Sequence, residues 1–109
     1  EKGNVLNIAK IAAISASKKT HDLIPLCHQI PLNQVDINFK FNDKDYCILL
    51  VSIVSTDWKT GVEMEALTAV SIASLTIYDM CKSIDKSIRI TDIQLDKKTG
   101  GKSGSYKRN

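Results

Sequence analysis

The spacing of apolar residues predicts two helices and a hairpin between them. Apolar residues recur every three or four positions in residues 5–19, as on the buried face of a helix. Residues 35–41 instead alternate between apolar and polar, as in a half-buried strand, and the aliphatic segment 46–55 predicts a returning strand after the polar turn 42–45. A long apolar run then predicts a second helix from about residue 62 to residue 84.

The remaining segments indicate an α+β fold. Residues 20–32 contain both prolines and are expected to form a loop, whereas the aliphatic residues of 88–95 predict a last strand with an irregularity near Thr91 and Asp92. The order helix, strand, strand, helix, strand is that of a ferredoxin-like βαββαβ unit without its first strand. We therefore expect this strand to be missing from the chain or to lie elsewhere in the assembly. The open sheet edge that it leaves favours pairing with another chain.

Composition favours a single soluble domain over residues 1–109. A chain of 109 residues is long enough for one core. Its three cysteines are widely spaced and lack a Cys-x-x-Cys pair, which argues against a disulfide framework. This pattern favours a reducing, intracellular location, and it does not distinguish between cytoplasm and organelle. The longest uncharged stretch of the second helix, residues 66–78, is too short to span a bilayer, so we expect no membrane partner.

The second predicted helix carries charged residues at both ends. Glu63 and Glu65 lie in its first turn, where the helix dipole favours acids, and they do not share a helix face. Asp79 and Lys82 lie three residues apart near its end, and they are either a structural ion pair or a general acid–base pair with a desolvated lysine. Because the two ends are about 24 Å apart on a straight helix, the chain has either two sites or one site shared with elements from elsewhere, such as a neighbouring subunit.

Two loops contain further candidates for ligand binding. His28 follows Cys27 in a proline-flanked loop, and we interpret it as a ligand contact or proton-transfer residue, with a structural histidine as the alternative. No second histidine has a comparable context, so no metal site is expected. The segment KTGGKSG at 98–104 lacks the glycine that a Walker A motif needs at position 96, but its glycines and lysines can still bind phosphate oxygens. The chain has no acid after Asp96, and its basic tail is either a solvated flexible terminus or a contact for a phosphate-bearing partner.

Five segments form a more specific pattern together than any one of them does alone. They are KGNV at 2–5, LIPLCH at 23–28, TGVEMEALTAV at 60–70, LTIYDMCK at 75–82 and KTGGKSG at 98–104. In this order they closely resemble the MoaC family, the cyclic pyranopterin monophosphate synthases of molybdenum cofactor biosynthesis. The resemblance implies a ferredoxin-like fold in a homohexamer, built as a trimer of dimers with the active site at the dimer interface, and it implies no cofactor.

The resemblance also implies a reaction. A lyase of this family rearranges a GTP-derived substrate, 3′,8-cyclo-7,8-dihydroguanosine 5′-triphosphate, into cyclic pyranopterin monophosphate and releases pyrophosphate. The implied catalytic residues are Asp79, Lys82 and Lys2, which would move protons during ring opening and reclosure. The implied substrate contacts are Leu26, Cys27, His28, Glu63, Met64, Glu65, Lys98 and Lys102. Among these, His28 and the two lysines of the tail would hold the triphosphate and offset charge on the departing pyrophosphate.

Two other classes of function are compatible with the order of elements. An RNA-recognition module has the same order, but it needs exposed aromatic residues on its central strands. Here Phe39 and Phe41 alternate onto one face, which is typical of a core, so we expect no nucleic-acid partner. The other alternative is an oligomeric binding or regulatory domain without activity, which tight binding of the cyclised triphosphate without turnover would indicate. The presence of Lys2, Asp79 and Lys82 favours the enzyme.

Overall fold

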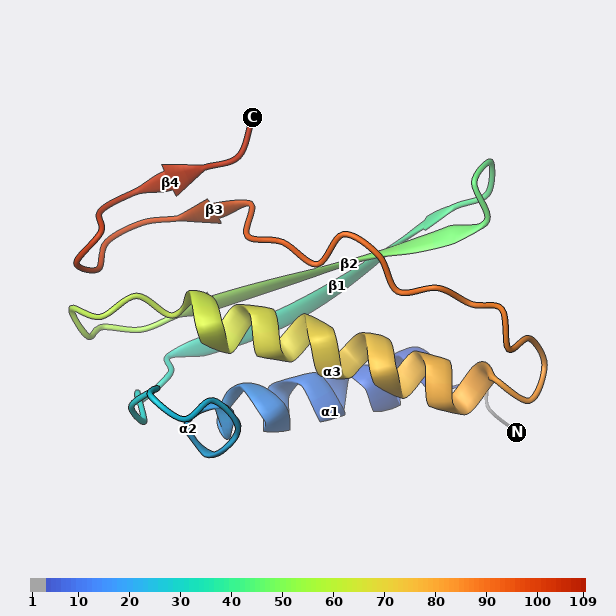
Figure 1. Cartoon of the computed structure of the whole chain (residues 1–109), viewed down its shortest axis with the longest axis horizontal. Helices are drawn as coiled ribbons and strands as arrows, with labels where there is room; N and C mark the ends of the chain where they lie inside the picture. The colour runs from blue at the N-terminus through green and yellow to red at the C-terminus, as the bar shows by residue number, and fades with distance from the viewer. Residues whose placement is uncertain (1–3) are drawn as a thin grey trace.

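The computed structural model describes residues 4–109 and shows an α+β fold in which two helices cover one face of a β hairpin (Figure 1). Helix α1 (Val5–Ser17) packs against strand β1 (Gln34–Asn42), and helix α3 (Glu63–Cys81) packs against strand β2 (Cys47–Ser55). A short helix, α2 (Thr20–Leu23), lies in the segment predicted as a loop. Both long helices and the hairpin therefore confirm the order predicted from the apolar pattern.

The hairpin follows the predicted alternation of side chains. Its strands pair antiparallel, and the residues with apolar side chains on β1 face the helices, where Ile37 is 2% exposed and Phe39 packs against the core. Phe41 lies on the same face near the hairpin turn, but it is exposed, so only part of the predicted aromatic face is buried. The turn is held by Asn42, whose Oδ1 accepts hydrogen bonds from the backbone N–H groups of Lys44 and Asp45 at 3.0 and 3.2 Å.

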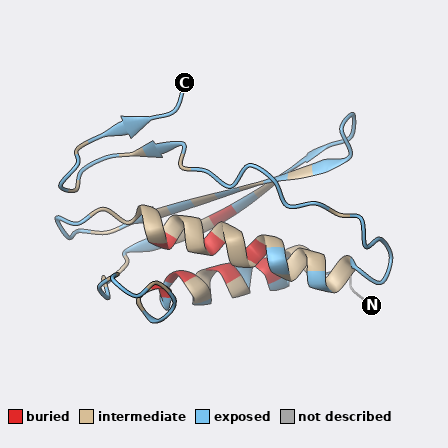
Figure 2. Ribbon diagram, in the orientation of Figure 1, coloured by how far each residue is buried: buried red, intermediate tan, exposed pale blue. Residues whose placement is uncertain are grey.

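The core consists mainly of alanines at the contact between α1 and α3. Ala9 and Ala13 of α1 and Ala69 and Ala73 of α3 are fully buried beside Ile37, and Figure 2 shows these positions in red where the helices meet. Because the distance between packed helices depends on the side chains between them, alanines let the two backbones approach closely. The hydroxyl of Ser52 on β2 also donates a hydrogen bond to the carbonyl of Ala66 at 2.7 Å, which ties the hairpin to α3.

Three hydroxyl side chains of helix α3 are satisfied within the helix. The hydroxyls of Ser71, Ser74 and Thr76 each donate a hydrogen bond to the carbonyl four residues earlier, at 2.7–2.8 Å. The helix begins one residue later and ends three residues earlier than predicted, with Lys82 at its C-cap. Within residues 4–109, no helix is both long enough and apolar enough to cross a membrane.

The predicted last strand at residues 88–95 is wrong, because the structure forms no strand there. The chain after α3 runs extended and then forms a small hairpin from β3 (Lys97–Lys98) and β4 (Tyr106–Lys107). The backbone irregularity expected near Asp92 is present, since this residue has a φ of 55°. A strand needs a neighbouring strand to pair with, and within residues 4–109 no strand pairs with this segment.

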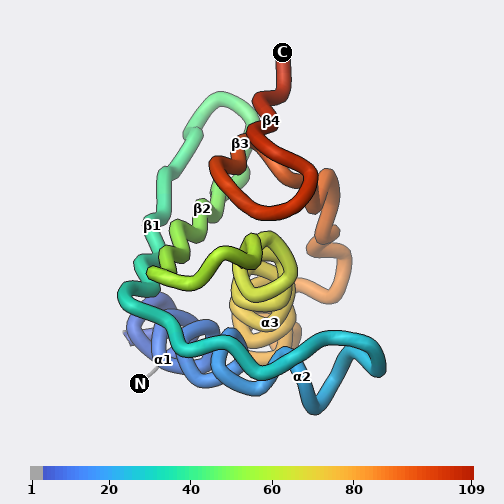
Figure 3. The backbone as a smooth tube through the Cα atoms, turned by 90° about the vertical axis from the view of Figure 1, so that its left-hand side faces the viewer, coloured from blue at the N-terminus to red at the C-terminus, as the bar shows by residue number. Residues whose placement is uncertain are grey.

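An open groove of about 1310 Å³ is lined by β2 and the extended segment. Figure 3 shows the backbones of these two segments on opposite sides of α3. Residues of β2 form one wall, residues 87–99 form the other, and one face of α3 also lines it, including Ala66, Val70 and Ile77. In the part of the chain that the structure describes, β2 pairs only with β1, so the second edge of β2 has no strand beside it. The described residues thus form a two-stranded sheet with one free edge next to a groove.

A larger side chain at the alanine contact should destabilise the fold. We expect Ala69→Leu to lower the free energy of unfolding by about 1–3 kcal/mol, because the buried site has no room for the added carbons. The measurement is urea denaturation followed by circular dichroism. The control is Ser15→Leu on the exposed face of α1, which should change stability by less than about 0.5 kcal/mol. Equal effects of the two substitutions would mean that α1 and α3 are not close-packed.

Candidate active site

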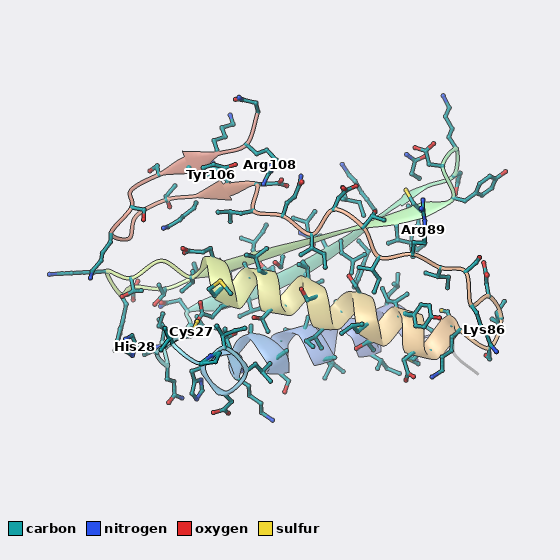
Figure 4. The ribbon with its side chains drawn as sticks, viewed as in Figure 1. Cys27, His28, Lys86, Arg89, Tyr106 and Arg108 are labelled. Carbon is teal, nitrogen blue, oxygen red and sulfur yellow. The ribbon has the colours of Figure 1, made fainter. Side chains whose placement is uncertain are left out.

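Helix α3 divides the site residues predicted from the sequence into two groups. Glu63, Met64 and Glu65 lie in its first turn, whereas Asp79 and Lys82 lie at its end. Figure 4 shows Cys27 and His28 at the end of the molecule where α3 begins, and Lys86 at the opposite end. The predicted site residues 26–28 and 98 are grouped with residues 63–65, and this set is called the α3-start cluster. Because the helix is regular over 19 residues, the two groups are separated by about 24 Å, as expected from the sequence.

The loop that carries Cys27 and His28 is fixed beside the start of α3 by hydrogen bonds from its far end. The backbone N–H of Asn33 donates to the carbonyl of Ser55 at 2.8 Å, and the Thr56 hydroxyl donates to the carbonyl of Pro31 at 2.6 Å. Leu26 is 92% exposed and His28 is also exposed. Exposed side chains contribute little to a core, so this placement favours a ligand or partner contact over a structural role for His28.

The two glutamates of the first turn have different surroundings, as their spacing predicted. Glu63 faces the C-terminal hairpin, where its Oε2 lies 3.3 Å from Nζ of Lys98. Glu65 is 4% exposed, and its burial raises the pKa of its carboxyl. A hydrogen bond from its own backbone N–H lowers the pKa, the charge of Glu63 raises it, and the charge of His21 lowers it. Sequence reasoning set His21 aside, and no local pattern could have revealed this proximity because α2 and α3 are far apart in the chain.

The glycine-rich tail segment packs against the loop that precedes α3. Gly100, Gly101 and Gly104 have φ values of 76–79°, a conformation that side chains rarely adopt. A Cβ atom on Gly101 would lie 3.0 Å from the backbone nitrogen of Gly61, so the tail touches this loop directly. No helix follows the segment within the described chain, and Lys102 is exposed. The arrangement differs from a Walker A loop, as expected from the residue at position 96.

Asp79 and Lys82 form an ion pair at the far end of α3. The Lys82 Nζ lies 3.0 Å from Oδ1 of Asp79, and the side chains are 53% and 72% exposed. An exposed pair of this kind stabilises a fold by only about 0–1 kcal/mol, so stability does not explain it. The desolvated lysine expected for an acid–base pair is not present in the chain alone. Substrate or a neighbouring subunit would have to exclude water from it.

The remaining predicted positions add no metal centre. Lys2, the third implied catalytic residue, lies outside the described residues. Among residues 4–109, no group of three or more histidine, cysteine, aspartate or glutamate side chains is placed to hold a metal ion. Cys27, Cys47 and Cys81 are free thiols.

Comparison with known families and proteins decides the family. The model of the MoaC family matches residues 1–101. The chain belongs to the MoaC family. Among its relatives, the Arabidopsis thaliana protein named "cyclic pyranopterin monophosphate synthase, mitochondrial" is 54% identical over 107 residues, which is 98% of this chain and 40% of the relative.

Bacterial relatives named cyclic pyranopterin monophosphate synthase are similar over as much of the chain. The protein of Natranaerobius thermophilus is 57% identical over 95% of this chain and 65% of its own length. That of Peptoclostridium acidaminophilum is 54% identical over 99% of this chain and 68% of its own length. The chain thus spans about two thirds of these bacterial MoaC-family proteins and less than half of the plant one.

The buried Glu65 should make stability depend on pH. A raised pKa means that the folded state holds the Glu65 proton more tightly than the unfolded state, in which the value is near 4.5. Stability should therefore be highest below this value and should fall as the pH rises through the higher pKa of the folded state. We expect Glu65→Gln to remove this fall and to raise the melting temperature at pH 7.

Thermal unfolding from pH 4 to pH 8 measures the effect of Glu65→Gln. Asp43→Asn, in the exposed hairpin turn, is the matched control and should leave the wild-type profile unchanged. If Glu65→Gln instead had a lower melting temperature than the wild type at neutral pH, the fold would favour the charged carboxylate. That result would contradict the expected effect of burial.

Proposed function

We propose that this chain provides the catalytic domain of a cyclic pyranopterin monophosphate synthase. The reaction is conversion of the cyclised GTP derivative to cyclic pyranopterin monophosphate with release of pyrophosphate, a step of molybdenum cofactor biosynthesis. The observation that carries the proposal is 54–57% identity, over nearly the whole chain, to relatives with this name. The family model matches residues 1–101 of this chain and the Peptoclostridium acidaminophilum relative aligns with 108 residues, so the two matches together include every motif from which the site residues were predicted.

Asp79 and Lys82 are proposed as the proton-transfer residues, together with Lys2. The contact of 3.0 Å between Asp79 and Lys82 supports this role, because it allows one group to donate a proton while the other stabilises the charge that remains. Their exposure also leaves them accessible to a substrate. The rearrangement requires rings to open and close, and each such step needs a proton to be added or removed.

The α3-start cluster is proposed to bind the substrate, with Lys102 beside it. His28 and Lys102 are exposed, and Lys98 is held beside the first turn of α3, so three groups that can carry positive charge lie at this end of the molecule. Cations of this kind suit the triphosphate and the pyrophosphate that leaves. Leu26, Cys27, Met64 and Glu65 would contact the remainder of the substrate. The proposal includes no cofactor, no nucleic acid and no membrane.

We further propose that each site is shared between subunits of a homo-oligomer, with a hexamer built as a trimer of dimers. The separation of about 24 Å within one chain supports sharing, because one nucleotide-sized substrate cannot reach both groups. The face of β2 turned away from the helices also exposes Leu49, Val51 and Ile53, with Leu49 56% exposed. A row of apolar side chains of this kind is typical of a protein–protein contact, and a second copy of the chain would cover it.

A ferredoxin-like sheet is the proposed complete fold. In a βαββαβ sheet the first strand lies between the third and the fourth, which correspond here to β2 and the extended residues 88–95. The groove lies at this position and is lined by both segments and by α3. A strand from the part of the protein that precedes α1 would pair with the free edge of β2 and give the extended segment its missing partner.

Pyrophosphate release from the cyclised GTP derivative tests the proposed activity. It should be measured on this chain and on a chain extended at its N-terminus. We expect Asp79→Asn and Lys82→Ala to lower kcat by about 10²–10⁴-fold, because each removes a proton-transfer group. Lys44→Ala in the exposed hairpin turn is the control and should keep the normal rate. Normal rates for both site variants would overturn the assigned roles, and binding without turnover by the wild type would indicate a binding domain instead.

Mixed oligomers test whether two chains share one site. Glu65→Gln and Asp79→Asn should each be inactive alone, since each damages every site. In a two-fold symmetric dimer assembled at random from both variants, about a quarter of the sites contain two intact residues, so about a quarter of the activity should return. The measurement is pyrophosphate release after the two variants are unfolded and refolded together. No recovery would mean that Glu65 of one chain and Asp79 of another do not form one site, and it would overturn the proposed sharing.

A further inference from the structure

The contact between Glu63 and Lys98 differs from the other ion pairs of the molecule. Lys98 is 11% exposed, and every other lysine among residues 4–109 is exposed. Its Nζ donates to Oε2 of Glu63 at 3.3 Å, across 35 residues of sequence. Removing an ammonium group from water is costly unless a partner of opposite charge is held in place. A lysine in this position is therefore restricted to one region of space before any ligand arrives.

Two glycines make this position possible. A Cβ atom on Gly61 would lie 2.5 Å from Oε1 of Glu63 and 2.7 Å from Cε of Lys98. A Cβ atom on Gly101 would lie 3.2 Å from the same Cε of Lys98. Any side chain at either position would therefore push Lys98 or Glu63 aside. These four residues, Gly61, Glu63, Lys98 and Gly101, are called the Lys98 clamp.

The hydrogen-bonding groups of the Lys98 clamp are only partly paired within the described residues. Oε1 of Glu63 is buried and has no hydrogen-bond partner, although a buried carboxylate oxygen normally has one. An ammonium group has three N–H donors, and Glu63 accepts from one of them. The remaining donors of Lys98 can reach an anion that approaches from outside. Two negative groups repel each other, so a phosphate would approach Lys98 and avoid Glu63.

We propose that Glu63 is a positioning residue that holds Lys98 for the phosphate groups of the substrate, and that Gly61 and Gly101 are required for this. The inference rests on the proposed function and refines the sequence prediction, in which Glu63 contacts the substrate itself. A lysine that is already oriented loses little freedom when the anion binds, so the clamp strengthens binding before any chemical step. Its loss should raise KM more than it lowers kcat.

A double-mutant cycle separates positioning from direct contact. Glu63→Ala, Lys98→Ala and the double variant are compared with the wild type by pyrophosphate release. We expect each single substitution to raise KM by about tenfold, with a smaller change in kcat, because a charge-assisted contact is lost. If Glu63 acts through Lys98, the double variant should be no worse than Lys98→Ala. If the two single effects multiplied, KM of the double variant would rise by about a hundredfold. That result would mean that Glu63 contacts the substrate independently, and it would overturn the inference.

The glycines provide a second test with a matched control. Gly100 and Gly101 are adjacent and have nearly equal φ values of 76° and 79°, but a Cβ atom on Gly100 would meet nothing within 4 Å. Both alanine variants therefore place a side chain at a similar positive φ, and only Gly101→Ala also crowds Lys98 and the backbone of Gly61. We expect Gly101→Ala to raise KM several-fold more than Gly100→Ala. Equal values of KM would mean that contact with Lys98 is unimportant and would overturn the role of the glycines.

Binding of inorganic pyrophosphate keeps this inference separate from the proposed activity. Titration calorimetry on the wild type, Glu63→Ala and Lys98→Ala requires no turnover. Weaker pyrophosphate binding by both variants supports the Lys98 clamp. If the cyclised GTP derivative is then not converted by the wild type, only the proposed function fails. Wild-type affinity in both variants, or no binding by the wild type, would overturn the role of Lys98 in holding phosphate. Melting temperatures close to that of the wild type would show that the variants remain folded.

Discussion

The contact between α1 and α3 determines where the functional side chains lie, because α3 carries residues of both groups. Four buried alanines form this contact together with Ile37 of β1. Small side chains hold the two helices close, and the hydrogen bond from Ser52 to the carbonyl of Ala66 fixes the hairpin on α3. The loop that carries Cys27 and His28 is then bonded to the end of β2, which places it beside the start of α3.

The rigidity of α3 has a direct consequence for catalysis. A regular helix cannot bring its first and last turns together, so Glu63 and Asp79 remain about 24 Å apart in every conformation that keeps the helix intact. Each end of α3 offers only part of what the proposed reaction needs: anion binding at the start, and proton transfer at the end. The exposed apolar face of β2 and its free edge beside the groove are both surfaces that association or an added strand can cover. The proposed sharing of one site between subunits depends on such surfaces being covered in the assembly.

Much of the fold was predictable because the apolar pattern reports which face of each element is buried. The helical spacing of apolar side chains in residues 5–19 predicted the bounds of helix α1 to within two residues. The alternation of apolar and polar side chains in residues 35–41 predicted the bounds of strand β1 equally well. The segment 88–95 has an equally strong strand composition but forms no strand. Strand propensity describes only how side chains fit a sheet, whereas strand formation needs a hydrogen-bonded neighbour, and β2 lies across a groove from this segment. Within the site, the ion pair of Asp79 and Lys82 followed from their spacing of three, whereas its exposure did not.

The sequence by itself determined the family, the order of the first elements and the residues that carry the proposed chemistry, since these depend on residue types and short spacings. Only the tertiary structure decided which distant residues meet. It placed Lys98 against Glu63 across 35 residues and His21 close enough to Glu65 to influence its pKa. It also showed that Gly61 and Gly101 are needed to make room for Lys98. Contacts of this kind depend on how whole elements pack, and a local pattern of apolar and polar positions does not record them.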